Sequence, residues 1–414
     1  MKAGWEAKSI ATFAKTGAGG TPKKSTKAFY EGGDIPWLLS GEVANANIVE
    51  AKNFITAEGL KGSSAKLFPA NSVLVAMYGA TAGEVGVLRF EAATNQAVCA
   101  VLPSDQHIPE YLYYYLLHAK PSLVAQAVGN AQPNISQAKI KSLEIPLPPL
   151  EEQQRIVAVL DDAFEGLARA RAHAEANLQN ARELFERSAA MIFEESAAND
   201  NPQKFLVGEL ALPEKGSIRT GPFGSQLKHS EFVDEGISVL GIDNAVQNEF
   251  RWGKARFITE EKYEGLKRYT VKPRDVIITI MGTCGRCAII PDDIPTAVNT
   301  KHLCCISLDQ SKCLPEFLHR YFLHSPKGRE YLSAQASGSV MDGLNMGIIK
   351  SMPVDVPPLE RQQIIADKLS EIDGHTRRLA EYCQSKIQDL NDLRQSLLQK
   401  AFAGELTESE AEPA

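Results

Sequence analysis

The segment IPLPPLEEQQRIVAVL, from Ile145 to Leu160, returns 209 residues later as VDVPPLERQQIIADKL, from Val354 to Leu369. Repetition at a fixed offset is the signature of a duplicated structural unit. We therefore predict one unit of roughly 200 residues used twice, instead of the two or three unlike domains that the length would otherwise indicate. Three further pairs recur in the same order: IPWLLSGEV (35–43) with ISVLGIDNA (237–245), FPANSVLVAMYGATAGEVGVL (68–88) with KPRDVIITIMGTCGRCAII (272–290), and TNQAV (94–98) with VNTKH (298–302).

A long helix is expected after each repeated Pro-Pro, because apolar residues then recur at alternating three- and four-residue spacing for about five heptads. Proline before the run and glutamate just after it suit a helix start. The pattern predicts a coiled coil, and an amphipathic helix lying on its own globule is the alternative. The apolar positions are Ile156, Leu160, Ala163, Leu167, Ala170, Ala174, Leu178, Ala181, Leu184, Ser188 and Met191, then Ile365, Leu369, Ile372, Thr376, Leu379, Cys383, Ile387, Leu390, Leu397 and Ala401.

The part of each unit before its helix has a different pattern. Short β-branched runs such as SVLVAMYG and DVIITIMG are bounded by turn residues and indicate buried strands. Helical stretches such as PEYLYYYLLHA and PEFLHRYFLHS lie between them, which predicts a mixed α/β (α+β) globule. The expected organisation is globule 1–150, helix 151–200, globule 201–358, helix 359–404 and a disordered acidic tail 405–414.

Composition places the chain among folded globular proteins. Apolar residues make up 44% and charged residues 23%, which excludes wholesale disorder. No apolar run is long enough to span a membrane and no secretory signal is recognisable, so we expect a cytoplasmic protein without a membrane partner. The seven cysteines are few and odd in number, which suits a reducing compartment.

The formal net charge of −7 argues at first against a nucleic-acid partner. Its distribution changes that conclusion. The two globules carry +2 and +1, whereas the first helix carries −6 and the segment from residue 360 onward carries −4. The acidic balance therefore belongs to the helices and tail, and DNA binding by the globules is not excluded.

No familiar catalytic motif is found. The phosphate-binding loop, the nucleophile elbow and the Asn-Pro-Pro-aromatic tetrapeptide of amino-methyltransferases are all missing from the sequence. Cys284-Gly-Arg-Cys287 is the one motif typical of a metal site. Because the first copy has Tyr78-Gly-Ala at the matching place, we expect no metal and small buried cysteines.

Two similar globules on two long helices indicate a protein in which the helices fix the spacing between two binding domains. If the helices pair antiparallel, the globules are related by a pseudo-two-fold axis, whereas parallel pairing would place both globules at one end. Proteins that read two DNA half-sites place their reading elements a helical turn, or a multiple of it, apart. The antiparallel arrangement therefore suits a split DNA target.

Three stretches resemble the specificity subunit of type I restriction-modification enzymes. They are GGTPKKSTKAFYEGGDIPWLLSGEV (19–43), the pair YGATAGEVG and NQAV, and QPNISQAKIKSLEIPLPPLEEQQRIVAVLD (132–161). The resemblance covers essentially the whole chain. The second copy departs from the pattern with TGPFGSQLK (220–228) in place of GGTPKK, and with SGSVMDGLN (337–345) in place of GNAQPNIS. Such departures are expected if the two copies read different half-sites.

The resemblance implies a protein with no catalytic activity or cofactor of its own. Each globule would be a target-recognition domain that reads half of a bipartite, asymmetric and gapped sequence in double-stranded DNA. The helices would hold two methyltransferase subunits, which use S-adenosylmethionine to methylate adenine. Restriction-translocase subunits that use ATP and Mg²⁺ would complete the complex. A stand-alone methyltransferase or nuclease, and a coiled-coil adaptor that does not read DNA, are the alternative functions.

Polar and basic side chains in loops are the candidates for DNA contact, because they present hydrogen-bonding groups to base edges and phosphates. Asn95 and Asn299, which occur in both copies, are interpreted as turn formers. Asn134, Ser136 and Asn345 are expected to cap short helices, and Trp37 to lie in the core. The candidates are Thr21, Lys23, Lys24, Tyr78, Thr81 and Gln96 in the first globule, and Arg219, Thr220, Ser225, Gln226, Lys228, Thr283, Arg286, Thr300 and Lys301 in the second.

Overall fold

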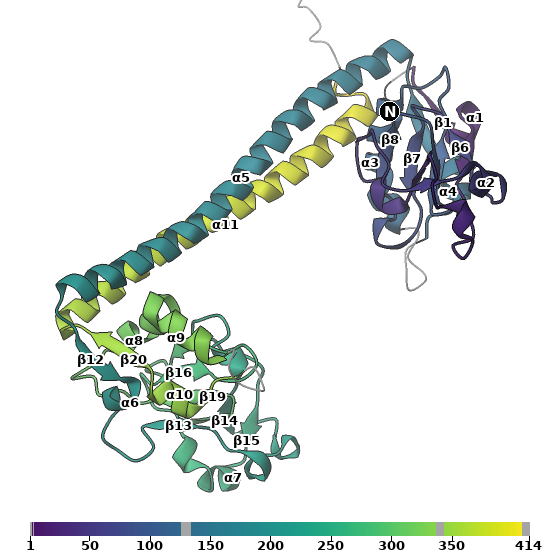
Figure 1. Cartoon of the computed structure of the whole chain (residues 1–414). Coiled ribbons are helices and arrows are strands. Elements are labelled where there is room, and N and C mark those ends of the chain that lie inside the picture. Colours follow the sequence, from purple (N-terminus) through teal and green to yellow (C-terminus); the bar gives the residue numbers. More distant parts are fainter. Residues whose placement is uncertain (1, 3, 126–133, 337–342, 408–414) are drawn as a thin grey trace, which may run out of the picture. The chain divides into compact units, whose positions relative to one another are not determined.

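The chain folds into two compact units, which are described separately (Figure 1). Unit 1 comprises Met1–Glu175 and Ser385–Ala414, and unit 2 comprises Ala176–Gln384. The computed structural model describes residues 2, 4–125, 134–336 and 343–407. None of the helices within these ranges is both long enough and apolar enough to cross a membrane.

Unit 1 contains a five-stranded sheet in the order β2-β10-β7-β8-β4 and a four-stranded sheet in the order β5-β3-β9-β6. The apolar run VLVA forms β7 and is buried on both faces: Val73 and Val75 face one core cluster, and Leu74 and Ala76 face another. The strands are β2 (Thr16–Ala18), β3 (Ile35–Leu38), β4 (Asn47–Ile48), β5 (Phe54–Ile55), β6 (Leu67–Phe68), β7 (Val73–Ala76), β8 (Val85–Leu88), β9 (Ala92–Thr94) and β10 (Val98–Val101).

Unit 2 repeats this plan with a four-stranded sheet in the order β13-β19-β16-β17 and a three-stranded sheet in the order β15-β14-β18. The run VIIT forms β16, whose residues also alternate between two core clusters. The predicted duplication and mixed α/β class are therefore confirmed. The strands are β13 (Ile218–Thr220), β14 (Ile237–Leu240), β15 (Phe257–Ile258), β16 (Val276–Thr279), β17 (Cys287–Ile289), β18 (Ala297–Asn299) and β19 (Leu303–Ile306).

Short helices complete each unit. Ser136 accepts a hydrogen bond from the backbone of Lys139 at 3.3 Å, and Asn345 accepts one from Ile348 at 3.0 Å, so these two predicted caps are confirmed. The other predicted cap, Asn134, instead forms an isolated β-bridge with Tyr78. The helices are α1 (Ile10–Phe13), α2 (Ala57–Lys61), α3 (Pro109–Ala125) and α4 (Gln137–Ser142) in unit 1, and α6 (Val207–Leu210), α7 (Glu260–Glu264), α8 (Pro315–His324), α9 (Pro326–Ala336) and α10 (Met346–Lys350) in unit 2.

Two long helices, α5 (Leu150–Asn199) and α11 (Leu359–Ala403), pass through both units. In unit 1 the beginning of α5 packs with the end of α11, where Ile156 and Phe402 share one core. In unit 2 the end of α5 meets the beginning of α11, where Arg361 bonds Asp200 at 2.9 Å. The helices are therefore antiparallel within each unit, as predicted.

The apolar seam of α5 differs from the predicted heptad in its second half. Leu184 and Met191 were expected in the seam, but they are 55% and 58% exposed. Phe185 and Phe193 are buried instead, in a stripe with Ala181 and Ala189. Phe185 and Phe193 pack on α8, with 4.8 Å between the ring centroids of Phe185 and His324 and 5.5 Å between those of Phe193 and Tyr321, so they face the globule of unit 2.

A buried glutamine fastens each long helix to its globule. Gln153 receives a hydrogen bond from Ile108 N at 2.9 Å and donates to the carbonyls of Gln106 and Pro148 at 3.0 and 2.9 Å. Gln362 repeats all three bonds, with Leu314 N and the carbonyls of Lys312 and Pro357, at 2.8 to 2.9 Å. The repeated segments PPLEEQQ and PPLERQQ thus have the same role in both units. Each also follows a strand of a two-stranded sheet: β1 (Glu6–Ser9) pairs with β11 (Glu144–Leu147), and β12 (Gln203–Leu206) pairs with β20 (Pro353–Val356).

Residues 406 and 407, which follow α11, pack against the rest of unit 1. Leu406 packs on the core that contains Trp5, and the Thr407 hydroxyl donates a hydrogen bond to Glu152. The prediction of a disordered tail over 405–414 is therefore wrong for its first three residues. Residues 408–414 of that prediction lie outside the described part of the chain.

Candidate nucleic-acid interface

The six candidate residues of unit 1 lie in segments that meet at one edge of its five-stranded sheet. Strands β2 and β7 both run antiparallel to β10, and their last residues, Ala18 and Ala76, pair with Cys99 and Val98. The segments that leave β2 and β7 therefore lie beside the turn that enters β10. Those segments carry Thr21, Lys23, Lys24, Tyr78, Thr81 and Gln96.

The turn after β2 is held closely against the turn after β9. Gly20 N donates to Thr94 O at 2.9 Å, and the indole Nε1 of buried Trp37 donates to Gly20 O at 3.0 Å. The Thr21 hydroxyl hydrogen-bonds the side chain of Gln96. A Cβ at Gly19 would lie 2.3 Å from the carbonyl oxygens of Thr94 and Asn95, so only glycine allows this approach. The turn presents the exposed side chains of Lys23 and Lys24 to solvent.

The loop after β7 supplies Tyr78, whose side chain is 38% exposed, and Thr81. Gly79 between them adopts φ 75°, which favours glycine, and begins a short 3₁₀ turn over Gly79–Thr81. The phenol of Tyr78 is thus placed at the rim of the sheet edge. The structure brings all six unit 1 candidates to this edge.

The corresponding edge of unit 2 is formed in the same way. Thr220, at the end of β13, pairs with Cys304, and Thr279, at the end of β16, pairs with Leu303. The segment that follows β13 contacts the turn before β19, where Gly221 N donates to Thr300 O at 3.2 Å. The two sheets therefore present equivalent edges, but with different side chains.

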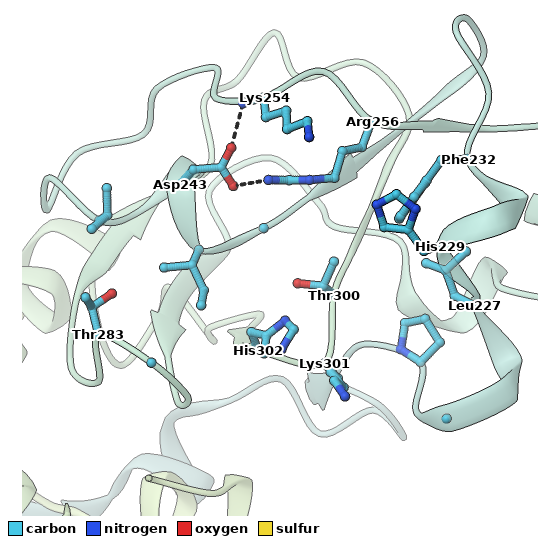
Figure 2. Close-up of a pocket in the computed structure, with 16 residues that line it drawn as sticks. Leu227, His229, Phe232, Asp243, Lys254, Arg256, Thr283, Thr300, Lys301 and His302 are labelled. Atoms are coloured by element: carbon cyan, nitrogen blue, oxygen red, sulfur yellow. Dashed lines mark hydrogen bonds and ion pairs between the residues drawn. The ribbon is translucent and has the colours of Figure 1, made fainter. Parts of the chain in front are cut away.

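A pocket of about 790 Å³ opens at this edge of unit 2 (Figure 2). Three predicted residues line it: Thr283, Thr300 and Lys301. Its other charged and histidine side chains were not predicted; they come from the 3₁₀ turn His229–Glu231, from the loop between β14 and β15, and from the turn before β19. These missed residues are His229, Asp243, Lys254, Arg256 and His302.

Asp243 organises the charged side of the pocket. Its carboxylate accepts hydrogen bonds from Arg256 and from the backbone N of Lys254, each at 2.6 Å. Burial alone would raise the pKa of Asp243, but the bonds from Arg256 and Lys254 outweigh it and lower that pKa. Asp243 is consequently ionised at neutral pH, and the loop that carries Lys254 is fixed.

The pocket is cationic at neutral pH. Burial, with the neighbouring charges of Lys301 and Arg256, lowers the pKa of His302, so this imidazole is neutral. Three cations, Lys254, Arg256 and Lys301, then line the pocket together with one carboxylate, that of Asp243. Such a site suits phosphates and the acceptor atoms of bases.

Other candidates of unit 2 lie around the pocket. Ser225, Gln226 and Lys228 are exposed, and Gln226 accepts a hydrogen bond from the Tyr269 hydroxyl at 2.9 Å. Arg286 does not line this pocket. It lies in a second one of about 370 Å³ that also contains Glu186 of α5.

Arg219 was predicted to contact DNA, and the structure corrects this. Its side chain is 8% exposed and forms an ion pair with Asp275 at 2.5 Å. The guanidinium also donates to the Ser307 hydroxyl at 2.9 Å and to Thr270 O at 2.7 Å. An arginine committed in this way belongs to the core, and sequence alone could not distinguish it from an exposed one because its partner is 56 residues away.

The remaining residue interpretations concern asparagine and cysteine. Asn95 accepts a hydrogen bond from Ala97 N at 3.1 Å, and buried Asn299 donates to Leu303 O at 3.1 Å, so both serve their turns as predicted. Burial raises the pKa of Cys304 to about 12 and also raises that of Cys287. Within the described ranges no three side chains of metal-ligating type converge.

Comparisons with known proteins agree with this architecture. A family model described as "Type I restriction modification DNA specificity domain" matches residues 2–174 and 226–388. The type I restriction enzyme MjaIX specificity subunit of Methanocaldococcus jannaschii is 26% identical over 434 residues, covering 97% of this chain and 93% of that protein. The EcoKI specificity subunit of Escherichia coli is 24% identical over 444 residues, covering 98% and 89%.

Two solved structures share the fold over nearly their full lengths. A chain from work on complex assembly and conformational transition of the type I R-M system gives a TM-score of 0.78 at 18% identity, covering 98% of this chain and 99% of that one. The crystal structure of the HsdS subunit from Thermoanaerobacter tengcongensis gives 0.59 at 17% identity, covering 98% of each chain. These likenesses establish the fold.

Proposed function

This chain belongs to the type I restriction modification DNA specificity family, and we propose that it selects the DNA target of such a system by reading two half-sites, one with each unit. The family supports DNA sequence recognition as the general activity. The observation that carries the bipartite proposal is the repeated sheet edge. Two copies of one frame present different polar residues at the same place.

The chemistry of the two edges favours different base sequences. Unit 1 offers a Thr21–Gln96 pair beside Lys23 and Lys24, and an amide can bond adenine in the major groove. Unit 2 offers the cationic pocket around Arg256 and Lys301, and such groups prefer the O6 and N7 acceptors of guanine. An asymmetric target follows from these differences.

The helices would dock two methyltransferase subunits. In unit 2, the exposed side chains of Leu184 and Leu379 line a pocket of about 490 Å³ on the helix pair. In unit 1, Val159 and Leu393 are 41% and 47% exposed. Apolar side chains left in water on two helices favour a protein partner. S-adenosylmethionine, ATP and Mg²⁺ would belong to the methyltransferase and restriction-translocase subunits, and this chain would supply no reacting group.

The test is the methylome of the host. Deleting the gene should abolish adenine methylation at one bipartite, gapped motif, and replacing residues 19–96 with the equivalent segment of another family member should change one half of that motif only. As a matched control, Leu184→Ala with Leu379→Ala should lower methylation without changing the motif. An unchanged methylome after deletion would contradict the proposal, and a change in both halves would contradict its modular form.

A stand-alone methyltransferase or nuclease is the competing function. The purified chain incubated with DNA, S-adenosylmethionine, Mg²⁺ and ATP is expected to give neither methyl transfer nor cleavage until methyltransferase subunits are added. Turnover by the chain alone would contradict the division of labour proposed above.

A further inference from the structure

An exposed tryptophan stands at the tip of a loop in unit 2. Trp252 lies between the 3₁₀ turn Ile242–Asn244 and β15, and its side chain is 59% exposed. Trp5 and Trp37 are only 8% and 5% exposed. An indole left in water forfeits the large free energy of burying an aromatic ring, and such rings are enriched where proteins bind partners.

The loop that carries Trp252 is fastened on both sides of it. Before the tip, Asn244 Nδ2 donates to Arg251 O at 2.9 Å, and Arg251 N donates to Asn244 O at 3.3 Å. After the tip, Lys254 N donates to Asp243 at 2.6 Å. Gly253 allows this approach, because a Cβ there would lie 2.1 Å from the Asp243 carboxylate.

The root of the loop is also fixed. Asn248 adopts φ 62°, its carbonyl oxygen lies 2.9 Å from His319 Nε2, and its Oδ1 accepts from Cys287 N at 3.3 Å. Phe250 packs on the core and meets the Trp252 ring edge-to-face with 5.3 Å between centroids. The indole is therefore held in place before any ligand arrives, which lowers the entropy lost on binding.

The surroundings of Trp252 favour a polyanion with flat, apolar faces. Arg251 is 57% exposed, and Lys254 and Arg256 line the cationic pocket that shares this loop. The nearby carboxylates are engaged, Glu249 with Arg251 at 3.0 Å and Asp243 with Arg256 at 2.6 Å. Cations for phosphates beside an aromatic ring for bases are the combination that nucleic-acid sites use.

The matching segment of unit 1 is also closed by a carboxylate that accepts a backbone hydrogen bond across the loop. There Glu42 receives hydrogen bonds from Leu39 N at 2.8 Å and Lys52 N at 3.0 Å, and Val49 is 70% exposed. An apolar residue is thus presented on a fastened loop in both units. Because an exposed apolar residue occurs on this loop in both units, its exposure is better explained by a role in binding than by chance.

We propose that Trp252 is a DNA-contacting residue of unit 2, whose indole packs against bases beside the Asp243–Arg256 pocket. This inference rests on the proposed DNA-reading function and deepens it. Apolar contact with base edges such as the thymine methyl contributes to both sequence preference and affinity. Trp252 would therefore affect only the half-site of unit 2.

The experiment uses the full chain labelled with 5-hydroxytryptophan and assembled with unlabelled methyltransferase subunits, so that only its three tryptophans are excited. Acrylamide should quench the emission of Trp252 far more than that of buried Trp5 and Trp37. Adding a random-sequence DNA duplex should protect the quenchable component, and the Trp252→Phe variant should lack that component. Binding of the same duplex, labelled with a fluorophore, is followed by anisotropy.

Trp252→Ala should weaken duplex binding by roughly 10-fold and Trp252→Phe by less, because alanine loses the apolar contact with base edges and phenylalanine keeps part of it. Leu206→Ala, which removes a 43% exposed side chain from β12 of the same unit, should leave binding unchanged. If the duplex binds but Trp252 remains quenchable, only this inference is wrong. If the methyltransferase subunits alone protect Trp252, the loop is a protein interface and the inference also fails. Absence of any DNA binding by the assembled complex would overturn the proposed function as well.

Discussion

Ser72 in unit 1 and Asp275 in unit 2 both stand directly before a buried strand, but their side chains form different hydrogen bonds. Leu88 N donates to Ser72 O at 2.9 Å, and Ile290 N donates to Asp275 O at 2.8 Å. The Ser72 hydroxyl bonds only a local carbonyl, whereas Asp275 forms a buried network with Arg219, Ser307 and Cys305. A backbone frame can thus be kept while its side-chain chemistry changes.

The contacts that fasten the long helices are the same in the two units, whereas the side chains at the sheet edge differ. The glutamine that fastens each long helix makes the same three hydrogen bonds in unit 1 and in unit 2. The sheet edges carry a Thr21–Gln96 pair in one unit and a cationic pocket in the other. The residues that hold the long helices are alike because both units attach to the same two helices, α5 and α11. The side chains at the two sheet edges differ, as a bipartite target would require.

The largest effect is expected from breaking the network around Asp275 in unit 2, which the described residues of unit 1 do not repeat at Ser72. Asp275→Ala leaves the Arg219 guanidinium buried without a counter-charge and should destabilise unit 2 by about 3–5 kcal/mol. Hydrogen exchange measured by mass spectrometry, peptide by peptide, should show faster exchange in unit 2. The matched Ser72→Ala change should leave unit 1 nearly unaffected. Equal effects in the two units would show that the network is not specific to unit 2.

The next prediction tests whether Gln153 and Gln362 have the same structural role in the two units. Gln153→Ala and Gln362→Ala each leave buried backbone groups unpaired, and each should destabilise its own unit by roughly 2–4 kcal/mol. The neighbouring Gln154 and Gln363 are exposed, so their alanine variants serve as controls and should be neutral. Exchange rates at the starts of α5 and α11 give the measurement. A neutral Gln362→Ala variant would refute the shared role.

Lowering the pH should destabilise unit 2 more than unit 1, by a smaller amount than the substitutions above. Burial lowers the pKa of His107 in unit 1, and of His319 and His324 in unit 2, to about 4. These groups bind protons only in the unfolded chain between pH 6.5 and 4, so stability is complete above 6.5 and falls as the pH decreases. Unit 2, with two such groups, should lose roughly 2 kcal/mol more than unit 1 between pH 7 and 5. Equal losses in unit-resolved exchange, corrected for intrinsic rates, would contradict this.

The smallest effect concerns salt and unit 1. Replacing Lys23 and Lys24 with glutamine should weaken binding of any DNA duplex a few-fold and reduce the slope of log affinity against log salt by up to about 1.8. Both lysines are exposed in the turn after β2, so folding should be unaffected. Lys27→Gln, in the same segment but ion-paired with Glu31, is the control. A slope that does not change would place the two lysines away from phosphates.

The sequence by itself determined the duplication, the two long helices and the elements that surround them, because these follow from periodicity and from turn and cap residues that act over a few positions. The Ser136 and Asn345 caps are of this local kind. It also led to the residues that gather at the sheet edge in unit 1, since strand order brings the ends of β2 and β7 together.

Only the tertiary structure decided which polar residues serve the core and which face the edge. Arg219 was expected at the surface and pairs with Asp275, and Asp243, Arg256 and Trp252 were missed. On α5, Phe185 and Phe193 are buried because they pack on the globule of unit 2, which the heptad pattern did not predict. The physical reason is the same in each case: whether a charge or a ring is buried depends on partners distant in sequence, whereas a helix or turn is set by its neighbours along the chain.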